Sequence, residues 1–307
     1  MKNKDLIGYG SALGAVFFWS FSFVWVKIAY EAYQPITVVS ARLIISSLLI
    51  FAIAALLKRL RKPSKKDLRL FFLMAFFEPF IYFLGESYGL LYVSSTVAAV
   101  IVATIPLLTP LAAWYFYKEK ISAITILGIS ISFIGVALVV LNKSLELTAS
   151  PLGIGLEFMA VFAAIAYAVV LKKLADRYNT LTIIAYQNLI GLMLFLPIWF
   201  AVDYKTFIVT PFNLTAFRAI ILLAIFSSTL AFVFFTGSIR KLGINRSNMF
   251  INLIPVFVAI LSLMILKDQL TAQKIIGIVV VVFGLFLAQA KRRKSKKKRK
   301  AFEVHNA

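Results

Sequence analysis

Ten apolar runs, each about 20 residues long, follow one another along the chain with short polar connections between them. A helix that crosses a membrane needs about 20 mostly apolar residues. The runs cover residues 8–28, 36–57, 69–91, 94–117, 122–141, 152–172, 180–202, 215–238, 247–266 and 273–290. The sequence therefore predicts an all-α polytopic membrane protein with ten transmembrane helices.

The distribution of Lys and Arg among the connections predicts the orientation of the chain. There are 33 Lys plus Arg and 12 Asp plus Glu, which gives a formal charge of +21. If the runs alternate across the membrane, 26 of these cations fall on the side of the N-terminus and 6 on the opposite side, while Arg42 lies inside a run. Cytoplasmic loops carry the excess of Lys and Arg. We therefore expect a multi-pass protein of the cytoplasmic (inner) membrane, with both termini in the cytoplasm.

The strongest cluster of charge is the segment KRRKSKKKRK at residues 291–300. Such a run in isolation is also typical of nucleic-acid binding. Directly after a span, attraction to anionic lipid headgroups explains it better, at about 1 kcal/mol for each charge. For the basic cytoplasmic tail, residues 291–307, we expect anionic membrane lipids as partners and no nucleic acid.

The second half of the sequence repeats the first at an offset of 149 residues. The residues that match at this offset include Pro106 and Pro255, Glu119 and Asp268, Gly128 and Gly277, and Gly135 and Gly284. Each unit holds five runs, an odd number, so the second unit must cross the membrane in the opposite sense. The sequence thus predicts two inverted five-helix repeats, residues 1–145 and 146–290. Inverted repeats occur in transporters, because two similar halves can open to either side of the membrane.

The chain resembles the EamA family of the drug/metabolite transporter superfamily in its ten spans and in two doubled segments, ATIPLLTPLAAWYFYKEKISAITILGISISFIGVAL and NLIPVFVAILSLMILKDQLTAQKIIGIVVVVFGLFL. The resemblance covers nearly the whole chain. It implies that the first, third, fourth, sixth, eighth and ninth spans line a central cavity, with the fifth and tenth at the periphery. One departure is Asp268, where the family more often has Glu, and we expect the same role at a helix end. The resemblance implies a small solute without identifying it.

Three prolines lie inside apolar runs. Pro106 and Pro110 are near the middle of the fourth run, and Pro255 is near the middle of the ninth. Each removes a backbone donor and is expected to kink its helix. The kinks could serve packing alone, or they could turn free carbonyl groups towards a cavity.

Four ionisable residues inside the spans are candidates for function, because a charge costs roughly 2.5 to 3.5 kcal/mol at the centre of a transmembrane helix. Glu78 is expected about 13 Å from the cytoplasmic surface, near the midplane, from a rise of 1.5 Å per residue. Glu78, Tyr82 and Glu86 are spaced i, i+4, i+8 and form one polar stripe on the third span. We therefore take Glu78 and Glu86 as candidates for proton coupling, the alternative for Glu78 being a neutral acid that is hydrogen-bonded between helices.

Arg42 is expected about 9 Å from the outer surface, level with Glu86 and Glu157. Pairing with one of these two carboxylates is the cheapest way to bury its charge. The three residues therefore form either a structural ion pair or a gate, and Arg42 could also bind a carboxylate group of a solute.

Polar and aromatic residues at midplane depth complete the predicted substrate site. An apolar wall with a few fixed hydrogen-bonding groups suits a small amphiphilic ligand. Any single one of them could instead serve packing alone. The expected substrate-binding residues are Trp19, Ser22, Glu78, Tyr82, Tyr167, Gln187 and Asn188.

Enzyme chemistry is not expected. Residues 85–89 read GESYG, which has the form of a nucleophile elbow, but Ser87 lies within a predicted span rather than on a strand-to-helix turn. The chain has no Cys, and its one histidine is His305 in the tail, so Ser-His chemistry, a metal site of the His/Cys kind and a disulfide scaffold are all excluded. No P-loop is present for ATP-driven transport.

The sequence thus predicts a secondary active transporter that moves a small metabolite, amino acid or drug-like solute by alternating access, with proton coupling and export as the expected mode. A lipid flippase and a membrane component without solute flux are the alternatives. We expect no cofactor and no metal, and either a monomer or a homodimer.

Overall fold

The computed structural model describes residues 3–117, 122–141, 149–268 and 270–290, and within these residues the regular structure is helical with no strand. Eight helices are long and apolar enough to cross a membrane: Leu6–Tyr30, Pro35–Leu56, Leu68–Tyr92, Ala123–Val140, Pro151–Ala175, Thr180–Val202, Leu214–Leu242 and Arg246–Leu266. Two shorter apolar helices, Ser95–Thr109 and Ala272–Ala288, lie in the fourth and tenth predicted runs. The all-α class is confirmed, and the count of ten spans stays a prediction.

Several of these spans are divided into shorter segments. The elements of the first half are α1 (Asn3–Tyr30), α2 (Pro35–Leu56), α3 (Leu68–Ala75), η1 (Phe76–Ile81), α4 (Tyr82–Tyr92), α5 (Ser95–Val102), α6 (Ile105–Tyr117) and α7 (Ala123–Val140). Those of the second half are α8 (Pro151–Ala175), α9 (Thr180–Val202), α10 (Tyr204–Val209), α11 (Leu214–Leu222), η2 (Leu223–Leu230), α12 (Ala231–Leu242), α13 (Ile244–Asn248), η3 (Met249–Leu253), α14 (Ile254–Leu261), η4 (Ser262–Leu266) and α15 (Ala272–Ala290).

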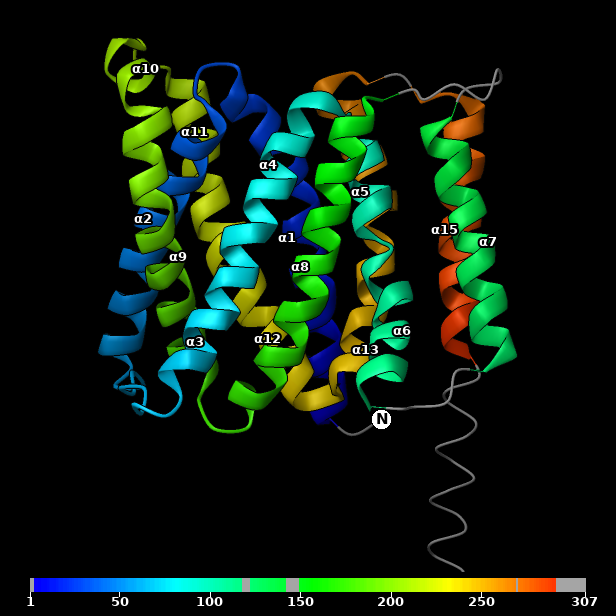
Figure 1. Cartoon of the computed structure of the whole chain (residues 1–307), viewed down its shortest axis with the longest axis horizontal. Helices are drawn as coiled ribbons and strands as arrows, with labels where there is room; N and C mark the ends of the chain where they lie inside the picture. The colour runs from blue at the N-terminus through cyan, green and yellow to red at the C-terminus, as the bar shows by residue number, and fades with distance from the viewer. Residues whose placement is uncertain (1–2, 118–121, 142–148, 269, 291–307) are drawn as a thin grey trace, which may run out of the picture.

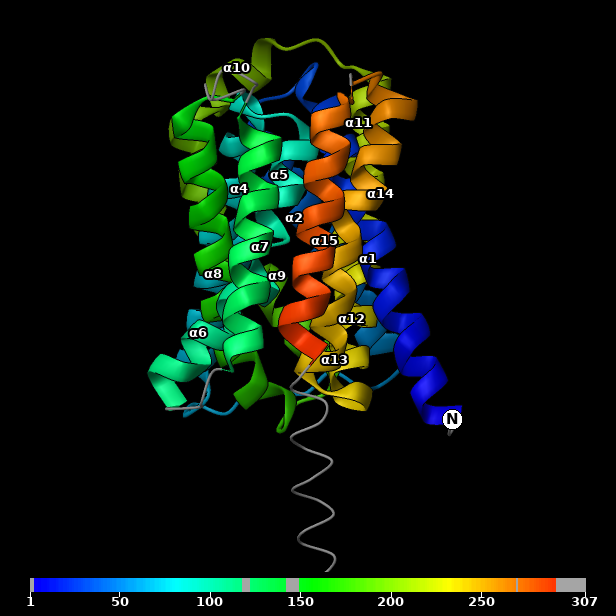
Figure 2. The ribbon, with the colours of Figure 1, turned by 90° about the vertical axis from the view of Figure 1, so that its right-hand side faces the viewer.

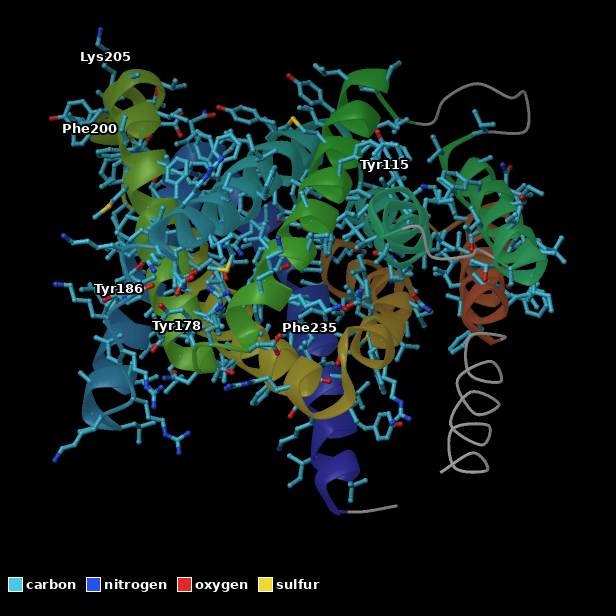
Figure 3. The ribbon with its side chains drawn as sticks, turned by 60° about the horizontal axis from the view of Figure 1, so that its bottom comes forward. Tyr115, Tyr178, Tyr186, Phe200, Lys205 and Phe235 are labelled. Carbon is cyan, nitrogen blue, oxygen red and sulfur yellow. The ribbon has the colours of Figure 1, made fainter. Side chains whose placement is uncertain are left out.

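The long helices form a bundle in which they run side by side between two ends (Figure 1). The short helix α10 lies at one end and the start of α1 at the other. The lipid-facing exterior is apolar, with Phe162 61% exposed and Val279 62% exposed. Figure 3 shows Lys205 extending from α10 away from the bundle.

Helices α7 and α15 lie side by side at one edge of the bundle, and they do so in both views (Figures 1 and 2). Glycines allow this close approach. A Cβ atom added to Gly128 would lie 2.6 Å from the carbonyl oxygen of Gly284, and one added to Gly135 would lie 2.8 Å from that of Gly277. Ser132 and Thr125 add hydrogen bonds from their hydroxyls to the carbonyls of Val281 and Ala288, at 2.9 and 3.1 Å.

We expect Gly128→Ala to lower the melting temperature of the purified protein. The new Cβ would meet the backbone of Ala288 and Gly284, so one helix must shift, and such overpacking costs about 1 to 3 kcal/mol. Gly155→Ala on α8 is the matched control, because nothing lies within 4 Å of its Cβ position and Ala is the better helix former. Equal melting temperatures for the two variants would contradict the role of Gly128 in this contact.

Pro106 and Pro255 each begin a new helical segment. Pro106 has no N–H to bond the carbonyl of Val102, α5 ends at Val102, and α6 starts at Ile105. Pro255 is likewise the second residue of α14, after the 3₁₀ segment η3. The helical hydrogen bonding therefore changes next to these two prolines, while Pro110 lies within α6.

The third span is also divided, at a point that the sequence stripe did not indicate. Glu78 has φ −146° and ψ 116°, an extended conformation inside a helical run. Pro79 follows it and packs on α9, where Gly191 leaves room: a Cβ atom added to Gly191 would collide with the Pro79 ring. The corresponding part of the second half, η2, also has π-helical geometry.

A cluster around Asp67 ties the connection between α2 and α3 to the α8–α9 turn. Arg177 donates to Asp67 Oδ1 at 2.5 Å, and the Tyr178 hydroxyl and Ser64 Oγ each donate to Oδ2 at 2.8 Å. The hydrogen bonds from Tyr178 and Ser64, followed by Arg177, hold the pKa of Asp67 below its ordinary value of 3.8. Because folding lowers this pKa, the carboxylate contributes stability above pH 3.8 that is lost as the pH falls through the folded-state pKa.

Candidate functional site

A cavity lies at the centre of the bundle, between segments of both halves, and we call it the central cavity. Its walls come from α1, α2, η1, α4, α5, α6, α8, α12, α13, η3 and α14. They include the spans that the resemblance implies, together with Arg42 of the second span, and neither α7 nor α15 contributes a lining residue. The space open to the centre of a water molecule is about 80 Å³, enough for several waters or a small solute.

The central cavity brings together most of the predicted site residues. Trp19, Ser22, Glu78, Tyr82 and Tyr167 all line it, as do Arg42 and Glu86. Gln187, Asn188 and Glu157 do not line it.

Gln187 and Asn188 do not line the cavity but hydrogen-bond to residues next to it. The Tyr167 hydroxyl donates to Gln187 Oε1 at 3.2 Å, which fixes the tyrosine that does line the cavity. Asn188 Nδ2 donates to Ser46 Oγ and to the carbonyl of Ser228, at 3.2 and 3.3 Å. Both amides therefore orient neighbouring elements of the wall.

Arg42 is 2% exposed and is held in place on two sides. Its Nε donates to Ser228 Oγ at 2.9 Å, and its guanidinium carbon lies 4.1 Å from the centre of the Phe83 ring, a cation–π contact. Its Nη1 is buried and has no hydrogen-bond partner. Within the described ranges the one ion pair at 4.0 Å or less is Arg177 with Asp67, so the pairing of Arg42 with Glu86 or Glu157 stays a prediction.

Glu78 lies in the wall at the break inside η1 and is 8% exposed. No residue that the structure describes hydrogen-bonds to its carboxyl group. Tyr82 donates to Glu86 Oε1 at 3.0 Å, so the second acid of the stripe is partnered where the first is not. The break leaves the carboxyl group of Glu78 facing the cavity without a competing helix partner.

Glu157 on α8 is fully buried beside the outer part of α4, and both of its carboxyl oxygens lack a partner. Gly89 of α4 makes room for it, since a Cβ atom there would lie 2.7 Å from Glu157 Oε1. Lys27 of α1 interacts with it electrostatically but donates to the carbonyls of Leu90 and Val93, the latter at 2.9 Å.

Lys27 and Tyr30 hydrogen-bond α1 to the C-terminal part of α4. Lys27 binds the last carbonyls of α4, and the Tyr30 hydroxyl donates to the carbonyl of Ser87 at 3.1 Å. Ser87 lies inside α4, so its GESYG context forms no nucleophile elbow. Asp268 also interacts with Lys27, and burial raises the pKa of its carboxyl group while Lys27 and Lys274 oppose this shift.

The wall of the central cavity is built largely from residues that match at the offset of 149. Six pairs of lining residues have this relation: Trp19 and Ala168, Ser22 and Leu171, Phe83 and Phe232, Glu86 and Phe235, Val102 and Ile251, and Ile105 and Ile254. Figure 3 shows Phe235 near the middle of the bundle. Arg42, Glu78 and Tyr167 have no lining counterpart. The frame of the cavity is therefore repeated, whereas most of its polar groups are not.

Ser228, Phe232, Phe235 and Asn248 are among the residues of this region that sequence reasoning missed. The repeat itself could have located Phe235, because it matches the predicted residue Glu86 at the offset of 149. The sequence contains no comparable signal for Ser228, which was found only through its bond to Arg42. In the described part of the chain no group of three or more His, Cys, Asp or Glu side chains could hold a metal ion.

Comparison with known proteins gives a consistent result. The chain matches the EamA-like transporter family twice, over residues 6–141 and 151–289. An uncharacterized transporter of Archaeoglobus fulgidus is 27% identical over 277 residues, which cover 90% of this chain and 96% of that protein. The uncharacterized transporter YetK of Bacillus subtilis is 26% identical over 255 residues, which cover 82% and 77%. One crystal structure has the same fold, with a TM-score of 0.69 at 18% identity over 96% of this chain and 99% of that one.

Proposed function

The chain belongs to the EamA-like transporter family, and from this premise we propose that it is a secondary active transporter which moves a small solute by alternating access. The family and the names of the relatives point to a multi-pass membrane transporter rather than an enzyme. The solute, the mode of coupling and the direction of transport are the parts that we add.

The observation that carries the proposal is the repeated frame of the central cavity. Six pairs of lining residues, such as Ile105 and Ile254, occupy matching positions of the two halves. An axis in the membrane plane that passes through the cavity would exchange the two members of each pair. Two states that open to opposite sides would then have similar energies, as alternating access requires.

The packing of α7 on α15 supports the same axis. Gly128 approaches Gly284, which matches Gly135, and Gly135 approaches Gly277, which matches Gly128. Reciprocal contacts of this kind are expected where a two-fold axis relates two surfaces. They favour inverted repeats at residues 1–145 and 146–290, which the basic tail 291–307 follows.

We infer an orientation with both termini in the cytoplasm of a cell bounded by a cytoplasmic membrane. The start of α1 lies at the end of the bundle opposite to α10. The α2–α3 connection, whose sequence is rich in Lys and Arg, lies at the same end as the start of α1. This arrangement is consistent with the positive-inside rule.

Glu78 is our candidate for proton coupling. It is a buried carboxyl group in the wall of the cavity, with no hydrogen-bond partner among the described residues, so a proton or a cationic group of the solute can neutralise it. If the solute carries a cationic group, as an amino acid does, that group and the proton compete for Glu78 and each leaves as the other binds. An inward proton gradient would then drive the solute outwards, and we therefore propose export.

The purified chain in sealed vesicles tests this function. The vesicles are loaded with labelled amino acids, nucleosides, organic acids or quaternary amines, and efflux is followed with and without an imposed pH gradient. We expect saturable efflux of at least one class of solute, above the leak of protein-free vesicles. No flux of any class, together with scrambling of a fluorescent phospholipid, would overturn the proposal in favour of a lipid flippase.

A further inference from the structure

Arg42 lines the central cavity and has a charge and a hydrogen-bond donor without a partner. It is 2% exposed, its Nη1 atom has no partner, and no carboxylate of a described residue lies within 4.0 Å of it. A buried guanidinium is costly unless its N–H groups are hydrogen-bonded. The resting protein therefore keeps this donor unsatisfied in a wall of its own cavity.

The neighbours of Arg42 hold the side chain without using its terminal nitrogens. Ser228 accepts from Nε at 2.9 Å, and the ring of Phe83 lies against the guanidinium face. Asn188, which donates to the carbonyl of Ser228, fixes η2 behind this contact. The side chain is thus fixed in orientation before any ligand arrives, and this lowers the entropy cost of binding.

The other lining residues indicate what the rest of the ligand is like. The aromatic rings of Trp19, Tyr82, Phe83, Tyr167, Phe232 and Phe235 line the cavity. The available space of about 80 Å³ suits a small molecule with an apolar body. A planar guanidinium matches the two oxygens of a carboxylate.

We propose that Arg42 binds the carboxylate group of the transported solute, which is a small organic acid or amino acid with an apolar body. Ser228 is the positioning residue that orients the guanidinium through Nε. The proposal rests on the transport function above and adds the chemical class of the solute to it.

Matched pairs of ligands test the proposal on the full-length purified chain in detergent. The pairs are benzoate and benzamide, 3-phenylpropionate and its amide, and L-phenylalanine and L-phenylalaninamide. Each amide keeps the apolar body and loses the carboxylate. We expect at least one acid to raise the melting temperature at a concentration where its amide does not. The phenylpropionate and phenylalanine pairs separate simple acids from amino acids.

Variants then assign the effect to Arg42. Arg42→Gln should weaken binding of the acid by at least about tenfold, because a charged hydrogen bond is lost. Affinity for the amide should not change. Arg42→Lys should recover part of the affinity, and Ser228→Ala should give a smaller loss with the charge retained. Arg218→Gln, an exposed arginine on α11, is the control and should bind as the wild type does.

The outcomes separate this proposal from the transport function. Equal binding of acids and amides, or full acid binding by correctly folded Arg42→Gln, overturns the role of Arg42. If none of the acids binds, the role of Arg42 is overturned as well. Transport of neutral or cationic solutes in the vesicle assay would then leave the transporter function standing. Where Arg42→Gln does not fold, the ratio of acid to amide affinity in Arg42→Lys and Ser228→Ala decides the matter.

Discussion

Glu78→Gln should abolish the dependence of transport on a pH gradient, while exchange of solute across the membrane continues. Gln has the same shape as Glu but cannot take up and release a proton. We therefore expect equal initial rates with and without an imposed gradient, where the wild type is accelerated by it. The measurement is efflux of labelled solute from vesicles that contain the purified variant.

The surroundings of Glu78 explain why this one carboxyl group carries the prediction. It is buried in the wall of the cavity and has no hydrogen-bond partner among the residues that the structure describes. The ionisable groups that line the cavity with it are Glu86 and Tyr82 of α4, Arg42 of α2 and Tyr167 of α8. Tyr82 occupies Glu86 with a hydrogen bond, so Glu78 is the acid in this group that is free to exchange a proton with the cavity.

Two further variants make the result at Glu78 interpretable. Glu78→Asp keeps the carboxyl group and should keep a response to the gradient. Glu31→Gln removes an exposed acid just after α1 and should behave as the wild type does. Proton-driven efflux at the wild-type rate in Glu78→Gln would reject the coupling role.

Ala168→Phe should reduce transport to the level of protein-free vesicles without destabilising the fold. Ala168 lines the cavity on α8, at the position that matches Trp19 in the first half. A phenyl ring there would take up space that the solute needs, since the cavity offers only about 80 Å³. Filling a cavity commonly stabilises a protein, so we expect an unchanged or higher melting temperature together with lost flux.

The matched control for this ring is Ala52→Phe on the exposed face of α2. It adds the same side chain towards lipid and should leave both flux and melting temperature unchanged. Flux at the wild-type rate in Ala168→Phe would place the transport route outside the central cavity.

The sequence allowed the architecture to be predicted further than the site. Apolar runs mark helices directly, because no other structure hides its backbone from lipid along a single segment. Eight of the ten runs form helices long and apolar enough to cross a membrane. Pro106 was expected to kink the fourth run, and the structure divides this run into α5 and α6 next to it.

Depth along a helix could be estimated from the sequence, but direction around it could not. Trp19, Glu78 and Tyr167 line the cavity. Gln187 and Asn188 of α9 do not line the cavity. They bond Tyr167 and Ser46 instead.

For the polar stripe on the third span, the prediction was confirmed although the helix is not regular. Its three residues, Glu78, Tyr82 and Glu86, do line the cavity together. They do so although the helix is broken at Glu78, which no spacing argument anticipated. The partner of Arg42 could not be predicted from the sequence either, because Ser228 is 186 residues away along the chain.

Alternating access around the central cavity is tested most directly by the accessibility of a single cysteine. The chain contains no Cys, so Ala168→Cys introduces the only thiol, in the wall of the cavity. Ala160→Cys, on the same helix but fully buried away from the cavity, is the control. A membrane-impermeant methanethiosulfonate reagent is applied to either side of oriented, sealed vesicles. Alternating access predicts that Ala168→Cys reacts from both sides and is protected by the transported solute, while the vesicles stay sealed and Ala160→Cys stays unreactive. Reaction from one side alone would contradict the proposed mechanism.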